Sequence, residues 1–419
     1  MRWKTLARVA ALVWVPFCAQ AAPLTLPEAM RLAETASPTV RSKEAQLSAA
    51  EGLQREAGRP LFNNPALTVD GARRRADGVD GRATEWTVGI AQPMELGGQQ
   101  SRRREAAAAG LDALRAEIED ARSQARAGAA TRFYAVITAE RRVRLERRST
   151  DMFDSVAQAV AKRRSAGEDT RLDANVAVVE AERSRNALAV ATEQLLEARS
   201  ELATALQLSP ELLPEVEPGP VAVHGEPVPY TLERLLASTD SLPKLRAVEA
   251  REGAARARMA LERANRYPDV TVGISTGREG FPDGRERLTT LSVSVPLPLF
   301  KRNEAAIGQA LTEVTQAEVE RVTATRDAQA QVRRLWSRLQ SQRERVLRLQ
   351  RSMLPASADN VQLAARSRQA GQIGLLDQLL VNRQALGAER ELNDALADYV
   401  ATQVELEHAA GWPLQGLPQ

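Results

Sequence analysis

The feature that most constrains this 419-residue chain is an internal repeat that keeps its spacing. The segment NPALTVDG, which begins at Asn64, has the counterpart YPDVTVGI, which begins at Tyr267. The segment QPMELGGQQ, from Gln92, has the counterpart VPLPLFKRN, from Val295, at the same offset of 203 residues. Each pair of segments delimits a candidate β-hairpin of the same length. The chain is therefore expected to use one supersecondary unit twice and to pack it against its copy.

The repeat continues beyond the hairpins at an offset of 204 residues. The dipeptide Ala166-Gly167, which is followed by Asp173, matches the dipeptide Ala370-Gly371, which is followed by Asp377. The two repeats are predicted to cover residues 22–208 and 230–411. A proline-rich linker, 209–229, joins them, and residues 412–419 form a C-terminal tail.

The first 21 residues are predicted to be a signal peptide. A basic start and a short apolar run precede Ala19-Gln20-Ala21, which is a small-x-small cleavage site. Cleavage after Ala21 would remove Cys18, the one cysteine of the chain. Lipidation of Cys18 is the alternative, although the proline and phenylalanine before it do not fit such signals.

Composition excludes several classes of function. Arginine and acidic residues alternate along the chain and give a net charge of +3, without a basic block for nucleic acid. The only histidines are His224 and His408, so a His/Cys metal site is not expected. No phosphate-binding loop occurs. We therefore predict neither catalysis nor a cofactor.

The pattern of the chain predicts long helices interrupted by two hairpins. In the first half, helices are expected over 27–61, 99–164 and 170–208, with strands over 66–74 and 84–92. In the second half, helices are expected over 232–266, 302–368 and 373–410, with a hairpin after the first of them. At 1.5 Å per residue, the helix over 99–164 would be about 100 Å long.

Apolar residues repeat along these helices at the spacing of a coiled coil. In the second half the repeat consists of Val332, Leu335, Leu339, Val346, Leu349 and Met353, with Gln342 as a polar break. A similar spacing in the first half runs through Leu111, Leu114, Ile118, Ala121, Ala125 and Gly128. A coiled-coil scaffold would also explain these helices.

The strands favour a membrane-spanning sheet. Apolar and small or polar residues alternate, as expected where one face meets lipid and the other lines a wet interior. The predicted lipid-facing residues are Trp86, Val88, Ile90, Val270, Val272, Ile274, Leu291, Val293 and Val295. The alternative is a periplasmic structural or adaptor protein whose hairpins lie in a water-soluble sheet.

Four strands cannot close a barrel, and each unpaired backbone group in lipid costs several kcal/mol. The chain is therefore expected to complete its barrel with other copies of itself. A homotrimer would supply twelve strands, with the long helices forming a tube of about 100 Å.

The segments QPMELGG at 92–98 and SVPLPLFKRN at 294–303 resemble the strand-to-helix corners of the TolC-like outer-membrane efflux channels. The resemblance covers the mature chain and favours the subgroup of cobalt–zinc–cadmium-type heavy-metal pumps. It implies a mainly helical trimer with a twelve-stranded barrel in the outer membrane of a Gram-negative bacterium. It also implies a periplasmic adaptor protein and a proton-driven inner-membrane transporter of the RND type as partners. Heavy-metal cations are the expected cargo, and a multidrug or type I secretion duct is the alternative.

The same resemblance implies two kinds of site. The residues expected to dock the adaptor are Gly167 and Gly371 in the helix–helix turns, with Arg164 and Arg368. At the periplasmic entrance, Asp377 matches a position of the family's acidic ring, and Asp173 is its counterpart in the first repeat. Leu380 stands at the next matching position, which departs from a double acidic ring.

Two further considerations apply to these turns. Ile373 and Arg368 occupy the places where a multidrug member has an arginine and a tyrosine that hold the entrance shut. Asp173 and Asp377 also suit the first turn of a helix, where the helix dipole favours a carboxylate. Both roles remain open for these two residues.

Overall fold

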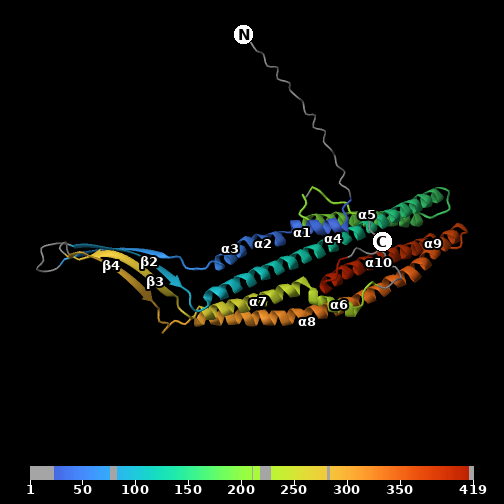
Figure 1. The fold of residues 1–419 in the computed structure, drawn as a ribbon. Coiled ribbons are helices and arrows are strands. Elements are labelled where there is room, and N and C mark those ends of the chain that lie inside the picture. The colour runs from blue at the N-terminus through green and yellow to red at the C-terminus, as the bar shows by residue number, and fades with distance from the viewer. Residues whose placement is uncertain (1–22, 76–82, 210, 218–227, 281–283, 415–419) are drawn as a thin grey trace, which may run out of the picture.

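A computed structural model describes residues 23–75, 83–209, 211–217, 228–280 and 284–414. The predicted signal peptide, most of the linker and the last five residues of the tail lie outside this part. The molecule is strongly elongated, with a small β-sheet at one end and helices along the rest of its length (Figure 1).

The order of elements repeats, as the sequence predicts. The first half contains α1 (Leu26–Ala36), α2 (Pro38–Ala45), α3 (Leu47–Ala57), β1 (Ala66–Arg74), β2 (Ala83–Met94), α4 (Gln99–Ser165) and α5 (Arg171–Ala205). The second half contains α6 (Leu232–Ser238), the 3-10 helix η1 (Thr239–Ser241), α7 (Pro243–Ala264), β3 (Val270–Glu279), β4 (Glu286–Ser294), α8 (Glu304–Arg348), the π-helix η3 (Leu349–Met353), α9 (Leu354–Gln369) and α10 (Leu375–Ala410). The predicted fold class is confirmed.

Helix α4 is the longest helix of the described structure and contacts other elements along its whole length. Its 67 residues, about 100 Å, contact α3 and α7 near the sheet and α5 and α10 toward the far end. Helix α8 lies beside α7, and α9 lies beside α10. The helices therefore form one curved layer rather than a compact bundle (Figure 1).

Three of the predicted long helices are interrupted, and proline accounts for most of the breaks. Pro38 begins α2, Pro243 begins α7, and Pro355 is the second residue of α9. Proline lacks the N–H that an interior position of a helix requires but is tolerated in the first turn. The predictions of unbroken helices over 27–61, 232–266 and 302–368 are therefore wrong at these points.

The π-helix η3 accounts for the change in the repeat offset. The offset is 203 residues at the hairpins and 204 at the turns, so the second long helix contains one more residue than the first. A π-helical turn accommodates an extra residue inside an α-helix. The structure has its π-helix at Leu349–Met353, just before Pro355.

The predicted seam is confirmed up to this π-helix. Val332, Leu339 and Val346 are fully buried and Leu349 is nearly so. Met353, the next member of the heptad and the last residue of η3, is 39% exposed and lies outside the seam. Val332, Leu339, Val346 and Leu349 pack with residues of α1, α4 and α10 in the main hydrophobic core.

The described part of the linker packs on the first repeat. The Leu24 N–H donates to the Glu215 carbonyl at 2.8 Å, and the Glu217 N–H donates to the Leu24 carbonyl at 2.9 Å. Val216 lies between these bonds and is buried in the main core. The described part of the proline-rich segment therefore connects the chain at Leu24, just before α1, to the layer of helices.

The four strands form one antiparallel sheet in the order β1-β2-β3-β4. Its small-residue face is crowded. A Cβ added at Gly89 would lie 2.8 Å from the Cβ of Ser275, and one at Gly273 would lie 2.7 Å from the Ser292 hydroxyl. On β2 and β3 the residues of this face are buried or half-buried, whereas most residues of the other face are exposed, so the sheet curls toward its small-residue face. The opposite face is convex and exposed.

Candidate channel entrance and membrane-facing sheet

The strand register places the predicted lipid-facing residues on one side of the sheet. Val88 pairs with Val69 and Thr276, Ile90 with Leu67 and Ile274, and Val272 with Val293. The apolar residues that share this convex face are Leu67, Val69, Trp86, Val88, Ile90, Met94, Val270, Val272, Ile274, Leu291 and Val293. Val295 directly follows β4.

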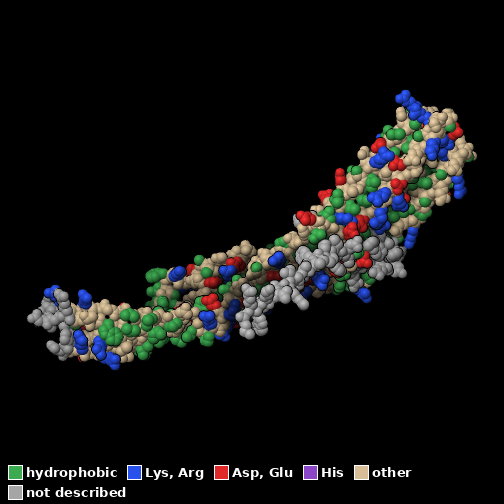
Figure 2. All heavy atoms as spheres, turned by 90° about the horizontal axis from the view of Figure 1, so that it is seen from above, with side chains coloured by type: hydrophobic (Ala, Val, Ile, Leu, Met, Phe, Trp, Pro, Cys, Tyr) green, Lys and Arg blue, Asp and Glu red, His purple; other side chains and the backbone are tan. Residues whose placement is uncertain are grey.

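No described residue of the chain covers this apolar face. Leu291 is 73% exposed and Leu67 is 72% exposed. Figure 2 shows a broad hydrophobic patch at the end of the molecule that carries the sheet. Within the described chain, β1 and β4 each pair with a neighbour on one side only. The sheet therefore presents both an apolar surface and two open edges.

The opposite end of the molecule is formed by the two helix–helix turns. Gly167 has φ +80° and Gly371 has φ +72°, the left-handed conformation that favours glycine. The Glu168 N–H donates to the Arg163 carbonyl at 2.9 Å, and the Gln372 N–H donates to the Ser367 carbonyl at 2.9 Å. These bonds close α4 and α9 in the same way, so the two turns are structural copies.

Asp173 and Asp377 both begin the helix that follows a turn. The Thr170 N–H donates to Asp173 Oδ2 at 3.0 Å, and the Gly374 N–H donates to Asp377 Oδ2 at 3.1 Å. The hydrogen bonds from the Thr170 hydroxyl and N–H hold the pKa of Asp173 below its usual value. Both residues therefore satisfy helix starts, and Asp377 remains exposed.

An ion pair that the sequence does not reveal joins the two turns. Arg368, at the end of α9, donates from Nη2 to Asp169 Oδ1 at 2.9 Å. Only 5% of the Asp169 side chain is exposed, and Arg163 Nε lies 3.3 Å from its other oxygen. The Arg368 side chain is therefore held by an ion pair within its own chain.

Basic side chains outnumber acidic ones around the turns. The basic residues are Lys162, Arg163, Arg164, Arg171, Arg366 and Arg368, and the acidic ones are Glu168, Asp169, Asp173 and Asp377. Arg164, a predicted docking residue, is exposed. The net charge of the side chains around the turns is therefore positive, and each carboxylate there lowers the positive electrostatic potential.

Buried carboxylates of α4 and α5 form ion pairs with arginines of α10. Glu146 of α4 accepts hydrogen bonds from Arg390 at 2.8 and 2.5 Å and from Arg142 at 2.7 Å. Burial alone would raise the pKa of Glu146, but these arginines outweigh burial and lower it. Glu180 of α5 binds Arg383 of α10 through both of its oxygens. Separating these helices would leave a buried charge unpaired.

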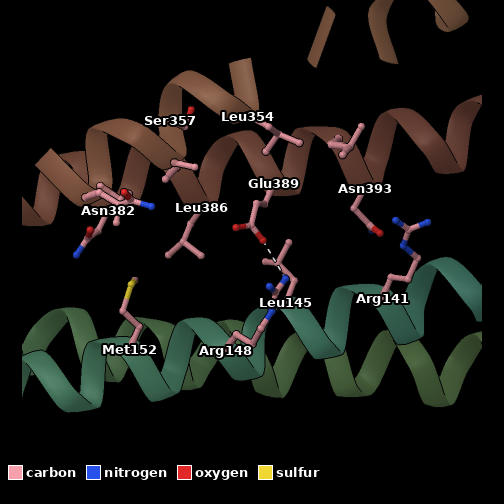
Figure 3. A pocket seen from close by; sticks show the side chains of 15 residues that line it. Arg141, Leu145, Arg148, Met152, Leu354, Ser357, Asn382, Leu386, Glu389 and Asn393 are labelled. Atoms are coloured by element: carbon pink, nitrogen blue, oxygen red, sulfur yellow. Dashed lines mark hydrogen bonds and ion pairs between the residues drawn. The ribbon is translucent and has the colours of Figure 1, made fainter. Parts of the chain in front are cut away.

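A cavity of about 590 Å³ opens between α4, α9 and α10, immediately after the π-helix (Figure 3). Leu145 and Met152 line it from α4, and Arg148 of α4 donates to Glu389 of α10 at 3.0 Å.

The described residues contain no group of three or more His, Cys, Asp or Glu side chains placed to hold a metal ion. In the same part of the chain, no helix is long and apolar enough to cross a membrane.

Comparison with known proteins gives a consistent assignment. The family model described as outer membrane efflux protein matches residues 29–207 and 237–412. The chain is 28% identical over 398 residues to the cobalt-zinc-cadmium resistance protein CzcC of Cupriavidus metallidurans, covering 93% of this chain and 89% of that protein.

Solved structures agree in fold. The outer-membrane channel OprN superimposes with a TM-score of 0.77 at 20% identity, over 92% of this chain and 89% of OprN. The outer membrane protein VceC of Vibrio cholerae gives a TM-score of 0.74 at 17% identity, over 93% and 97% of the two chains. The family model covers both repeats, and the chain belongs to the outer membrane efflux protein family.

Proposed function

We propose that this protein is the outer-membrane exit duct of a tripartite, proton-driven efflux pump that exports heavy-metal cations. The observation that carries the proposal is the curled four-stranded sheet, with an uncovered apolar face and two open edges, on helices about 100 Å long. Membership of the outer membrane efflux family supports the duct. The similarity to CzcC, which is described as a cobalt-zinc-cadmium resistance protein, supports the cargo.

The duct is proposed to be a homotrimer. Pairing β4 of one copy with β1 of the next would close twelve strands around the small-residue face, and outer-membrane lipid would cover the apolar face. The helices at the edges of the layer carry exposed apolar residues that neighbouring copies would cover. These residues are Leu172, Val179 and Val190 on α5 and Leu311, Val319 and Val322 on α8.

The assembly is tested with the purified protein. We expect a trimer in detergent, measured by light scattering, and ion conductance after reconstitution into planar bilayers. A monomer that inserts stably into a bilayer would contradict the proposal, because two open strand edges would then lie in lipid.

The helix–helix turns are proposed to dock the periplasmic adaptor, which links the duct to the RND-type transporter. Gly167, Gly371 and Arg164 are exposed at the end farthest from the sheet. Arg368, which holds the second turn against the first, would shape the docking surface rather than contact the partner freely.

Replacing Gly371 with valine should abolish export and leave trimers in the outer membrane. A Cβ at Gly371 meets nothing within 4 Å, so the effect comes from the left-handed backbone, which costs a side chain about 1–2 kcal/mol. The turn would change shape without disturbing the helices. Metal resistance of cells is measured together with the amount of trimer in outer membranes.

Asparagine, which tolerates this backbone, is the matched control: Gly371→Asn should retain export. Gly167→Val and Gly167→Asn repeat the comparison in the first turn. If both valine variants exported normally, docking would have to occur elsewhere, along the helices or at the linker.

Asp377 is proposed to face the entrance and to attract cations. Asp377→Asn should shift the selectivity of the reconstituted pore toward anions, because basic side chains dominate the turns once this carboxylate is neutral. The shift should shrink as salt screens the field over about 10 Å at 0.1 M. Reversal potentials at low and high salt measure it.

Asp173→Asn provides the comparison and should have a smaller effect. Asp173 is partly covered and accepts hydrogen bonds from Thr170. Unchanged selectivity in the Asp377 variant would limit that residue to the start of α10.

A further inference from the structure

Three arginines share the apolar face of the sheet, near the hairpin loops. Arg278 pairs directly with Arg287 across β3 and β4, and Arg278 also pairs with Trp86 of β2. Arg73 lies on the same face of β1, two residues beyond the partner of Trp86. All three arginines are exposed. In Figure 2, Lys and Arg side chains adjoin the hydrophobic patch at the outer end of the sheet.

The strands segregate charge by face. Every acidic residue of the four strands points to the concave side, namely Asp70, Glu85, Glu279 and Glu286. Arg74, the one strand arginine on that side, lies 3.1 Å from Glu85. Among the described residues, no carboxylate bridges Arg73, Arg278 or Arg287. The convex face is therefore apolar with a basic outer margin.

The direct pairing of Arg278 with Arg287 brings two positive charges together, which a bound anion would stabilise. Like charges opposite each other across strands destabilise a sheet. Arginine also binds phosphate through two parallel hydrogen bonds, which a lysine cannot do. Two arginines on neighbouring strands, a few ångströms apart, are thus suited to one phosphate group or to two that are linked.

The height of these arginines corresponds to the lipid headgroups. Eight residues of extended chain separate Val295 from Arg287, or about 26 Å along the strand. With the usual tilt of barrel strands, this is about 20 Å of height, close to the apolar band of about 25 Å. Trp86, in the same row as Arg278, is the kind of residue that lies at this boundary.

We propose that Arg73, Arg278 and Arg287 bind the phosphate groups of outer-leaflet lipids. The helices lie at the opposite end of the sheet, so in the orientation of the proposed function, on which this inference rests, the strand ends that carry these arginines face outward. The ligand class is a phosphorylated glycolipid such as lipid A, held by its phosphates against the arginines and by its acyl chains against the apolar face.

The test measures lipid binding to the detergent-purified trimer by native mass spectrometry. Diphosphorylated lipid A and the same lipid without phosphates are the two probes. We expect the wild type to bind the phosphorylated probe at least about tenfold more tightly. The double variant Arg278→Gln/Arg287→Gln should lose this preference. Arg74→Gln, on the same sheet but the other face, should keep it.

The outcomes separate this inference from the proposed function. A wild-type trimer that conducts ions but binds both probes equally would overturn the inference alone. Full preference retained in the double variant would also overturn it. A wild-type protein that forms no trimer and conducts no ions would overturn the proposed function. If the double variant does not assemble, Arg73→Gln decides: a weaker preference supports lipid binding, and an unchanged preference contradicts it.

Discussion

Replacing Val293 with arginine should keep the protein out of the outer membrane. Val293 is 63% exposed on the convex face of the sheet and pairs with Val272. An arginine on the lipid face costs roughly 2–4 kcal/mol at the bilayer midplane and less toward the interfaces, and a trimer would carry this cost three times. The amount of trimer recovered from outer-membrane fractions should fall strongly. Val272→Arg should have the same effect.

Ser292→Arg is the matched control, because it introduces the same side chain one residue earlier in β4. Ser292 pairs with Gly273 on the concave face, where a charged group would meet water in a closed barrel. Insertion should be nearly normal. Equal loss of trimer in the two variants would contradict the assignment of faces to lipid and lumen.

The second large effect concerns a buried carboxyl group near the end of α10. Glu407 is 3% exposed and accepts hydrogen bonds from the Tyr230 hydroxyl at 3.2 Å and from Gln403 at 3.0 Å. Both of these partners are neutral, in contrast to the arginines that bind Glu146. Burial raises the pKa of Glu407 to about 7, from an ordinary value of 4.5.

This carboxyl group should make stability fall as pH rises. Below about pH 4.5 it is protonated in both the folded and the unfolded chain. Between 4.5 and 7 only the folded chain retains the proton, so the free energy of unfolding decreases by about 3 kcal/mol per protomer. Glu407→Gln removes this loss. The variant should exceed the wild type in stability at about pH 8 and differ little at about pH 5.

Thermal unfolding followed by tryptophan fluorescence at the two pH values measures the effect. The quantity compared is the difference in melting temperature between variant and wild type, and how this difference changes between the two pH values. Other carboxyl groups titrate in both proteins, so their effect cancels in this comparison. Glu405→Gln changes the charge equally at an exposed site on the same helix and should show no such change. A pH-independent difference for Glu407→Gln would mean that this group is ionised in the folded protein.

The sequence predicts the strands and their faces well, for a physical reason. Alternation in a strand has a period of two residues, so Val88, Ile90 and Ile274 had to share one face once the register was set. The turns are equally accessible to prediction, because Gly167 and Gly371 supply a conformation that few other residues adopt.

Features that depend on distant pairs of residues could not be predicted in this way. Asp169 and Arg368 lie 199 residues apart, and nothing in either local segment indicates that they meet. Glu146 is one of many acids that alternate with arginine along the helices, yet its side chain is fully buried. Its environment is created by the packing of α10, which a local pattern does not specify.

The interrupted helices lie between these cases. Pro355 stands in the sequence within the predicted helix over 302–368, two residues after Met353, the last residue of the heptad seam. The chain nevertheless stays helical on both sides of the proline and changes only its local winding at η3. A proline inside a periodic segment is therefore better interpreted as a local distortion than as an end.

The single extra residue at η3 determines the symmetry that a partner would encounter. Three copies of a duplicated chain would place six similar long helices around one axis. Identical repeats would make that ring approach sixfold symmetry. Since only the second repeat has η3, the ring would instead alternate between two classes of helix and be strictly threefold. A partner ring of six identical subunits would then have to bind in two different ways, whereas a partner present in three copies could recognise one class alone.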